Sequence, residues 1–196
     1  AGWWLAHDGS AARRRRDDAR LLSMLDGHAA AAAALDDGAL AAACRAAARP
    51  AFTGLRLADG AAALALICEA VQRTLGLHPH PPQRVAAWRL ACGRMVELDT
   101  GEGKTLTAAM AAAMAALAGV PTHVVTVNDY LAQRDAGTMG PLFTFLGLRV
   151  GVVHSGVAQG ARAAEYACDL TYCTNKDLVF DYLRDRVSTP GNASAA

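Results

Sequence analysis

The spacing of apolar residues changes from helical to strand-like about halfway along the chain. From Gly60 to about Leu75 the apolar residues recur every three or four positions, which predicts a helix that ends near Gly76. Short runs of apolar and β-branched residues then predict four strands, at residues 94–98, 124–127, 148–153 and 170–173. Helical spacing predicts further helices at residues 106–117, 130–146, 159–167 and 178–184.

Strands that alternate with helices in this way indicate the fold class. Parallel strands need a helical crossover between them, and such crossovers are right-handed in nearly all proteins. We therefore expect an α/β fold, in which a parallel sheet is flanked by helices. Ligands of such sheets bind beyond the carboxyl ends of the strands, so a site is expected in the loops that follow the strands.

The first 50 residues have a different character, because alanine dominates them. Alanine favours helix but buries little surface, so residues 1–50 are expected to form a weakly anchored helical extension with a break at residues 36–38. Residues 51–186 would form the α/β domain. Residues 187–196 have the composition of a flexible tail.

Composition limits the classes of function without choosing one. The chain has 196 residues, of which 53% are hydrophobic, enough to fill one sizeable core. A net charge of +1 gives no overall field that would favour nucleic acid or an anionic membrane as the main partner. Five cysteines without a C-x-x-C pair predict free thiols in a reducing compartment. The longest uncharged apolar run, residues 106–120, is shorter than the ~20 residues that cross a bilayer.

The glycine loop Thr100-Gly101-Glu102-Gly103-Lys104-Thr105 carries the strongest chemical signal. A loop of this kind between a strand and a helix wraps backbone N–H groups around phosphate, while its lysine reaches the terminal phosphates and its threonine hydroxyl binds magnesium. Leu98 stands where the longer form of the motif has its first glycine, so the shorter, helicase-like form is predicted. Lys104 is one of only two lysines. The alternative is an ordinary glycine turn with an exposed lysine.

Two later stretches are more specific than the glycine loop: residues 127–132, Val-Asn-Asp-Tyr-Leu-Ala, and residues 180–185, Phe-Asp-Tyr-Leu-Arg-Asp. Together with the glycine loop they resemble the SecA family, the ATP-driven motors that push preproteins through the bacterial Sec channel. The similarity runs from about Leu75 to Arg186, and more weakly back to about Leu25. It implies an incomplete RecA-like sheet of the P-loop NTPase kind, with residues 51–186 as a partial DEAD-like nucleotide-binding domain.

The resemblance also implies cofactors and residue roles. ATP and Mg²⁺ would bind at Thr100, Gly101, Glu102, Gly103, Lys104 and Thr105, with Thr105 at the metal. Gln83 would pair with the adenine edge, since its amide both donates and accepts; the alternative is a solvated loop glutamine. Arg134 would lie near the nucleotide, or alternatively on an exposed helix face. Asn128 and Asp129 are expected to cap the next helix.

The same resemblance implies that the Sec channel and a preprotein are the partners, and that no nucleic acid is bound. It also implies that the protein lies on the cytoplasmic side of the inner membrane, to which it attaches peripherally. Arg13 to Arg16 could contact anionic lipid, with Trp3 and Trp4 as interfacial anchors. The alternative is a solvated helix face whose arginines pair with neighbouring aspartates.

The chain departs from the family in several places. Asp99 replaces an arginine before the glycine loop, Cys173 replaces a glycine, and residues 78–82 are rich in proline where an aromatic is usual. No Asp-Glu pair occurs in the sequence, although hydrolysis in such motors needs one for the magnesium shell and the attacking water. We therefore assign no catalytic residue and expect an incomplete motor that binds ATP without turnover. A helicase-type motor fragment and a truncated, non-catalytic nucleotide-binding module remain alternatives.

Overall fold

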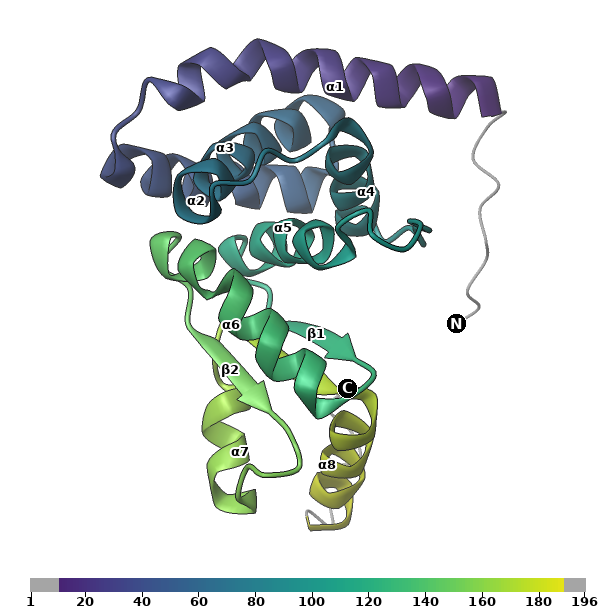
Figure 1. The fold of residues 1–196 in the computed structure, drawn as a ribbon, viewed down its shortest axis with the longest axis vertical. Coiled ribbons are helices and arrows are strands. Elements are labelled where there is room, and N and C mark those ends of the chain that lie inside the picture. The colour runs from purple at the N-terminus through teal and green to yellow at the C-terminus, as the bar shows by residue number, and fades with distance from the viewer. Residues whose placement is uncertain (1–10, 189–196) are drawn as a thin grey trace.

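The computed structural model describes residues 11–188, and the side chains of residues 12–187. Eight helices and three strands lie in this part of the chain (Figure 1). The helices are α1 (Ala11–Ala33), α2 (Asp37–Gly54), α3 (Leu57–Leu75), α4 (Pro81–Ala91), α5 (Lys104–Leu117), α6 (Asp129–Phe145), α7 (Gln159–Tyr166) and α8 (Asn175–Ser188). The strands are β1 (Thr122–Thr126), β2 (Val150–Val153) and β3 (Leu170–Thr174).

The three strands form a parallel sheet in the order β1-β3-β2. The central strand β3 is buried along its whole length. Because side chains alternate across a sheet, Tyr172 and Thr171 point to opposite faces. Tyr172 contacts Phe143 of α6, whereas the hydroxyl of Thr171 donates to the C=O of Glu165 in α7. The sheet is therefore covered by α6 on one face and by α7 on the other, as the predicted α/β fold requires.

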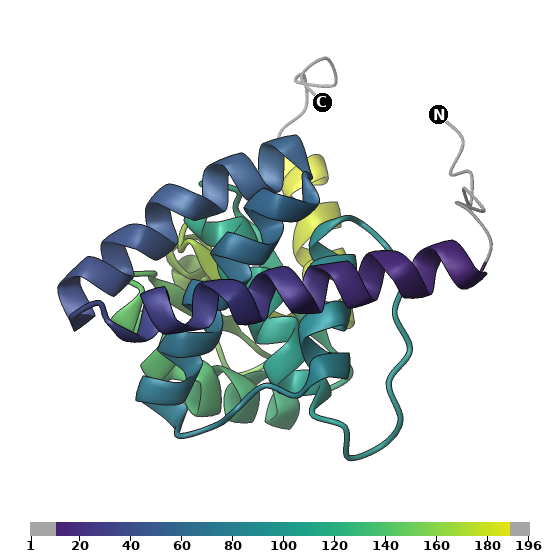
Figure 2. The same cartoon turned by 90° about the horizontal axis from the view of Figure 1, so that it is seen from above.

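A layer of helices lies on the far side of α5 from the sheet (Figure 1). Seen from above, α1 crosses the other helices of this layer (Figure 2). Helix α5 is buried along most of its length, because it packs against helices on one side and against β1 and α6 on the other. The glycine loop is attached to the start of this central helix.

The amino-terminal helices are more firmly anchored than the alanine content predicts. Leu21 and Leu25 of α1 and Leu40 of α2 are at most 2% exposed and belong to the same core as α3, α5 and α6. The predicted break is correct: Asp36 caps α2 by accepting from the N–H of Ala39 at 2.8 Å. Because α2 continues to Gly54, the boundary placed at residue 50 falls inside a helix, and the division into domains stays a prediction.

Helices α3, α5, α6, α7 and α8 agree with the sequence to within a few residues, and α3 is capped, as predicted, by Gly76 with φ 66°. Helix α4 was not predicted, and it places Gln83 at a buried helical position and not in a solvated loop. The fourth predicted strand is wrong, because residues 94–98 form no strand. An extended segment is stable as a strand only with a hydrogen-bonded neighbour, and in residues 11–188 neither edge of the three-stranded sheet pairs with it. Trp3, Trp4 and the predicted tail beyond Ser188 lie outside the described residues.

Candidate functional site

The glycine loop leads directly into the amino terminus of α5, which begins at Lys104. Gly101 and Gly103 have φ angles of 90° and 77°, in the left-handed region that residues with a Cβ rarely adopt. Helix α5 has no side-chain hydrogen bond at its cap among the described residues, and its first backbone hydrogen bond joins the N–H of Thr107 to the C=O of Gly103. The preceding N–H groups therefore point out of the positive end of the helix.

Gln83 joins α4 to the glycine loop. Its Nε2 donates to the C=O of Glu102 at 2.8 Å, and its Oε1 accepts from the N–H of His80 at 2.8 Å. A Cβ at Gly103 would lie 2.2 Å from Nε2, so the loop needs glycine beneath this amide. A primary amide has two N–H donors and two lone pairs, so one of each remains for a second partner. The adenine role of Gln83 stays a prediction that this geometry permits.

Lys104 folds back over the glycine loop. Its Nζ donates at 2.7 Å to the C=O of Asp99, which also accepts from the N–H of Glu102. The carboxylate of Glu102 in turn accepts from the N–H of Asp99 at 3.0 Å. The ammonium group must leave this carbonyl to reach a phosphate, and the exposed side chain is free to move there.

Thr105 is connected to α6 through a carboxylate. Its Oγ1 donates to Oδ2 of Asp135 at 3.4 Å. The other carboxylate oxygen, Oδ1, accepts from Nε and Nη2 of Arg134 at 2.8 and 2.6 Å. The guanidinium of Arg134 lies 5.8 Å from the ring centre of Tyr130. Arg134, predicted near the nucleotide, is thus linked to the proposed magnesium ligand through Asp135.

These residues fit a phosphate group with magnesium. Helix N–H groups, one ammonium and one hydroxyl are gathered at the loop, and a Cβ at Gly101 would meet nothing within 4 Å, so the loop faces open space. A pocket of about 200 Å³ lies between α1, α3 and the segment before α4, and its lining does not include the glycine loop. The candidate phosphate site therefore lies outside this pocket, with Gly101 facing open space.

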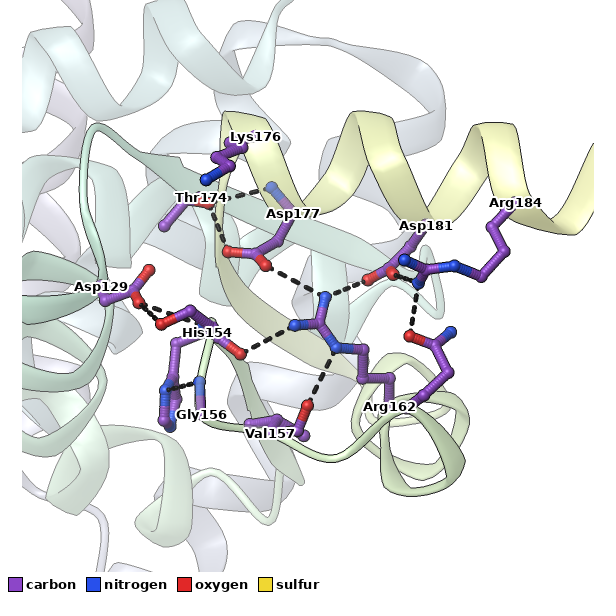
Figure 3. A network of polar contacts seen from close by, with 12 residues as sticks. Asp129, His154, Gly156, Val157, Arg162, Thr174, Lys176, Asp177, Asp181 and Arg184 are labelled. Atoms are coloured by element: carbon purple, nitrogen blue, oxygen red, sulfur yellow. Dashed lines mark hydrogen bonds and ion pairs between the residues drawn. The ribbon is translucent and has the colours of Figure 1, made fainter.

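A second polar cluster lies at the carboxyl ends of β2 and β3, with Arg162 of α7 at its centre (Figure 3). Nη1 of Arg162 donates to Asp177 at 3.0 Å and to Asp181 at 2.7 Å. Nε and Nη2 donate to the backbone C=O groups of Val157 and His154, at 3.1 and 3.0 Å. One guanidinium thereby ties α7 and the loop after β2 to α8.

The two carboxylates on α8 have further donors. The hydroxyl of Tyr166 donates to Asp181 at 3.0 Å, and the hydroxyl of Thr174 donates to Asp177 at 2.6 Å. Burial and the hydrogen bond to Asp181 raise the pKa of Tyr166, so its phenol stays protonated as a donor. Arg162, Asp177 and Asp181 thus have their hydrogen-bond partners within the cluster. We therefore interpret the cluster as a structural contact that holds α8 in place, and we propose no catalytic role for it.

The start of α6 also touches the loop after β2. Asn128 caps α6, as expected, by accepting from the N–H of Leu131 at 2.9 Å. Asp129 does not cap; its Oδ2 accepts from the N–H and the hydroxyl of Ser155 at 3.1 and 2.5 Å. These two hydrogen bonds lower the pKa of Asp129 below its usual value of 3.8. The expectation that both residues cap the helix is therefore correct only for Asn128.

The five cysteines are unpaired, in agreement with the prediction of free thiols. Burial raises the pKa of Cys44 and of Cys68 to about 12, so neither thiol is a nucleophile at neutral pH. Between residues 11 and 188 no group of three His, Cys, Asp or Glu side chains is arranged to hold a metal ion. In the same range, no helix has both the length and the apolar character needed to cross a membrane.

Sequence reasoning placed Gln83, Thr100 to Thr105 and Arg134 at one site, and the structure joins them through contacts that the sequence does not reveal. Gln83 meets the loop at Glu102, and Arg134 is linked to Thr105 only through Asp135. The Arg162 cluster was not predicted, although Asp181 and Arg184 belong to the stretch 180–185 that carries the resemblance. Arg162 precedes Asp177 and Asp181 by 15 and 19 residues, and no motif spacing in the sequence connects it to them.

Comparison with known proteins identifies relatives of this chain. Residues 8–195 match the family described as the SecA DEAD-like domain. Over 127 residues the chain is 50% identical to "Protein translocase subunit SecA" of Rubrobacter xylanophilus, a match that spans 65% of this chain and 14% of that protein.

Two further relatives are both named "Protein translocase subunit SecA 2". The protein of Nitrosospira multiformis is 47% identical over 131 residues, 67% of this chain and 20% of its own length. The protein of Bordetella avium is 47% identical over 134 residues, 68% of this chain and 20% of its own length. The chain therefore matches no more than a fifth of the length of these curated relatives.

Proposed function

Because this chain belongs to the family of SecA DEAD-like domains, we propose that it is the ATP-binding portion of a SecA-type motor. The whole motor would drive preproteins through the Sec channel of the bacterial inner membrane, working from the cytoplasmic side. The glycine loop at the start of α5 carries this proposal, because it gathers the donors that hold a nucleoside triphosphate with magnesium.

Each residue of the site has a role in this proposal. The N–H groups of residues 100–105 would surround the phosphates, and Lys104 would leave the C=O of Asp99 to neutralise them. Thr105 would bind the magnesium ion, whose charge would screen the phosphates. Gln83 would keep its contact with Glu102 and use its second N–H and second lone pair for the adenine edge. Arg134 would lie beside the nucleotide.

Binding without hydrolysis is proposed for this chain alone. The sequence has no Asp-Glu pair, so it lacks the usual carboxylate that orients the attacking water.

Contact of the basic segment at Arg13 to Arg16 with anionic lipid is a further part of the proposal, supported by the exposure of Arg15 and Arg16 on α1.

Isothermal titration calorimetry of the 196-residue chain with Mg-ATP tests the proposal. The two lysines give a matched pair of variants, Lys104→Ala in the loop and Lys176→Ala on α8. We expect saturable heat for the unaltered chain and for Lys176→Ala, and at least roughly tenfold weaker binding for Lys104→Ala, because a charge-assisted hydrogen bond is worth about 1.5–3 kcal/mol. Absence of heat for the unaltered chain, or equal affinity of both variants, would contradict it.

A further inference from the structure

Asp135 lies between two residues of the proposed nucleotide site. Its Oδ2 accepts from the hydroxyl of Thr105, and its Oδ1 accepts two hydrogen bonds from Arg134. The carboxylate is held in this position, because its side chain is only 13% exposed while that of Arg134 is 45% exposed. Arg134 thus fixes one oxygen of Asp135 and leaves the other directed at Thr105.

The distance between the two oxygens is slightly longer than the spacing of neighbouring ligands around magnesium, which suits a carboxylate that orients a ligand. Magnesium binds six oxygens in octahedral geometry at about 2.0–2.1 Å, which places neighbouring ligand oxygens about 3 Å apart. Oγ1 of Thr105 and Oδ2 of Asp135 lie 3.4 Å apart. The carboxylate that the structure brings to Thr105 comes from α6.

The surroundings of Asp135 include a buried phenol. Tyr172 of β3 is 1% exposed, and within residues 11–188 its hydroxyl has no hydrogen-bond partner. Burial and the negative charge of Asp135 raise the pKa of this phenol, so it remains protonated. The side chain of Asp135 is itself only 13% exposed, and a carboxylate shielded from solvent exerts a stronger field on a cation than a fully solvated one.

We propose that Asp135 is a positioning residue for magnesium at the glycine loop. It holds the hydroxyl of Thr105 and orders the oxygen shell of the ion, and Arg134 keeps it in place. The inference rests on the proposed function, because it concerns the metal that accompanies the nucleotide.

The test is a titration of the full chain with N-methylanthraniloyl-ADP, followed by fluorescence, once with Mg²⁺ and once with EDTA. The ratio of the two affinities measures the gain that magnesium provides. We expect Asp135→Asn to reduce this gain by about tenfold, the usual scale for groups that orient metal ligands, with little change in EDTA. Asp185→Asn on the exposed side of α8 is the matched control and should keep the full gain.

A double-mutant cycle adds a second readout. Thr105→Val should remove the same gain, and the double variant should lose no more than either single one, because both residues act on one ion. Should Asp135→Asn not fold, as judged by its circular dichroism melt, Arg134→Gln replaces it and should cause a smaller loss of the magnesium gain.

The outcomes separate this inference from the proposed function. An unaltered chain that binds no nucleotide overturns both. A chain that binds nucleotide without a magnesium gain, or an Asp135→Asn variant that keeps the gain, overturns only the role of Asp135. If Asp135→Asn weakens nucleotide affinity equally in Mg²⁺ and in EDTA, Asp135 merely stabilises the fold, and this result also overturns the inference.

Discussion

Helices at opposite ends of the molecule are attached by different forces. Helix α1 packs through leucines, with Leu21 and Leu25 inside a core that continues through α3 and α5. Helix α8 turns Asp177 and Asp181 inward, onto Arg162, and leaves apolar side chains exposed. Its most exposed apolar residues are Val179, Phe180, Tyr182, Leu183 and Val187.

The difference predicts how each attachment fails. Apolar burial has no direction and is shared among many side chains, so loss of one methyl group weakens it gradually. The attachment of α8 is centred on one guanidinium, whose loss leaves two inward carboxylates without their shared cation, with only the hydroxyls of Tyr166 and Thr174 and the exposed Arg184 as donors. Helix α8 should therefore detach as a unit while α1 stays in place.

The largest expected effect comes from Arg162→Ala. Removing one partner of a buried ion pair costs about 3–5 kcal/mol, and we expect a loss of this size in the free energy of unfolding. Hydrogen exchange should show lost protection in α8 and in the loop after β2. Arg184→Ala is the control, because Arg184 also pairs with Asp181 but is 51% exposed, so its loss should cost less than about 1 kcal/mol. Equal costs for the two variants would contradict the special role of Arg162.

Leucine truncations compare the two helices directly. Leu21→Ala on α1 should cost about 3 kcal/mol in urea unfolding, since the side chain is fully buried and leaves a cavity. Leu183→Ala on α8 makes the same chemical change at a residue that is 51% exposed, and should change stability by less than about 0.5 kcal/mol. Similar losses would show that α8 is attached by apolar contacts after all.

The glycine loop lies between the two regions, and two alanine substitutions test its packing. Gly103→Ala places a Cβ against Gln83 and also strains a residue with φ 77°, so it should cost about 1–3 kcal/mol in stability and weaken Mg-ATP binding. Gly101→Ala has a similar φ of 90° but meets open space. Thermal unfolding and calorimetry should therefore show the smaller loss for Gly101→Ala. The reverse order would refute the close contact with Gln83.

The smallest expected effect is pH-dependent. The pKa of Asp129 is lowered by Ser155, so this contact contributes stability at neutral pH that is lost as the pH falls below 3.8 and through the lowered value. Ser155→Ala should cost less than about 1 kcal/mol at pH 7, because the contact is exposed. Unfolding curves of the two proteins should converge in acid, and a difference that grows in acid would contradict the sign.

Local patterns predicted the local structure well. The helix after the glycine loop, the cap at Asn128 and the end of α3 at Gly76 follow from residues within a few positions of each other. The resemblance to SecA rested on contiguous motifs and is confirmed by the family match over residues 8–195. Residues 94–98 were wrongly predicted as a strand, because strand formation depends on a partner that apolar alternation cannot reveal.

Contacts between distant segments were less accessible to sequence reasoning. The anchoring of α1 was underestimated, since the alanine content concealed two leucines on its buried side. Asp135 stood beside a predicted site residue, but its contact with Thr105 spans 30 positions and depends on how α5 packs against α6. The inward carboxylates of α8 contradict the usual expectation that apolar residues point inward.

The position of β1 at the end of the strand order has a consequence for handling this protein. In the described part of the chain its outer edge pairs with no other strand, and the side chains of Val125 and Val127 nearby are exposed. An exposed edge strand of this kind can pair with extended segments of other polypeptides. Purified material should therefore self-associate as its concentration rises, and charged substitutions at these two valines should keep it monodisperse.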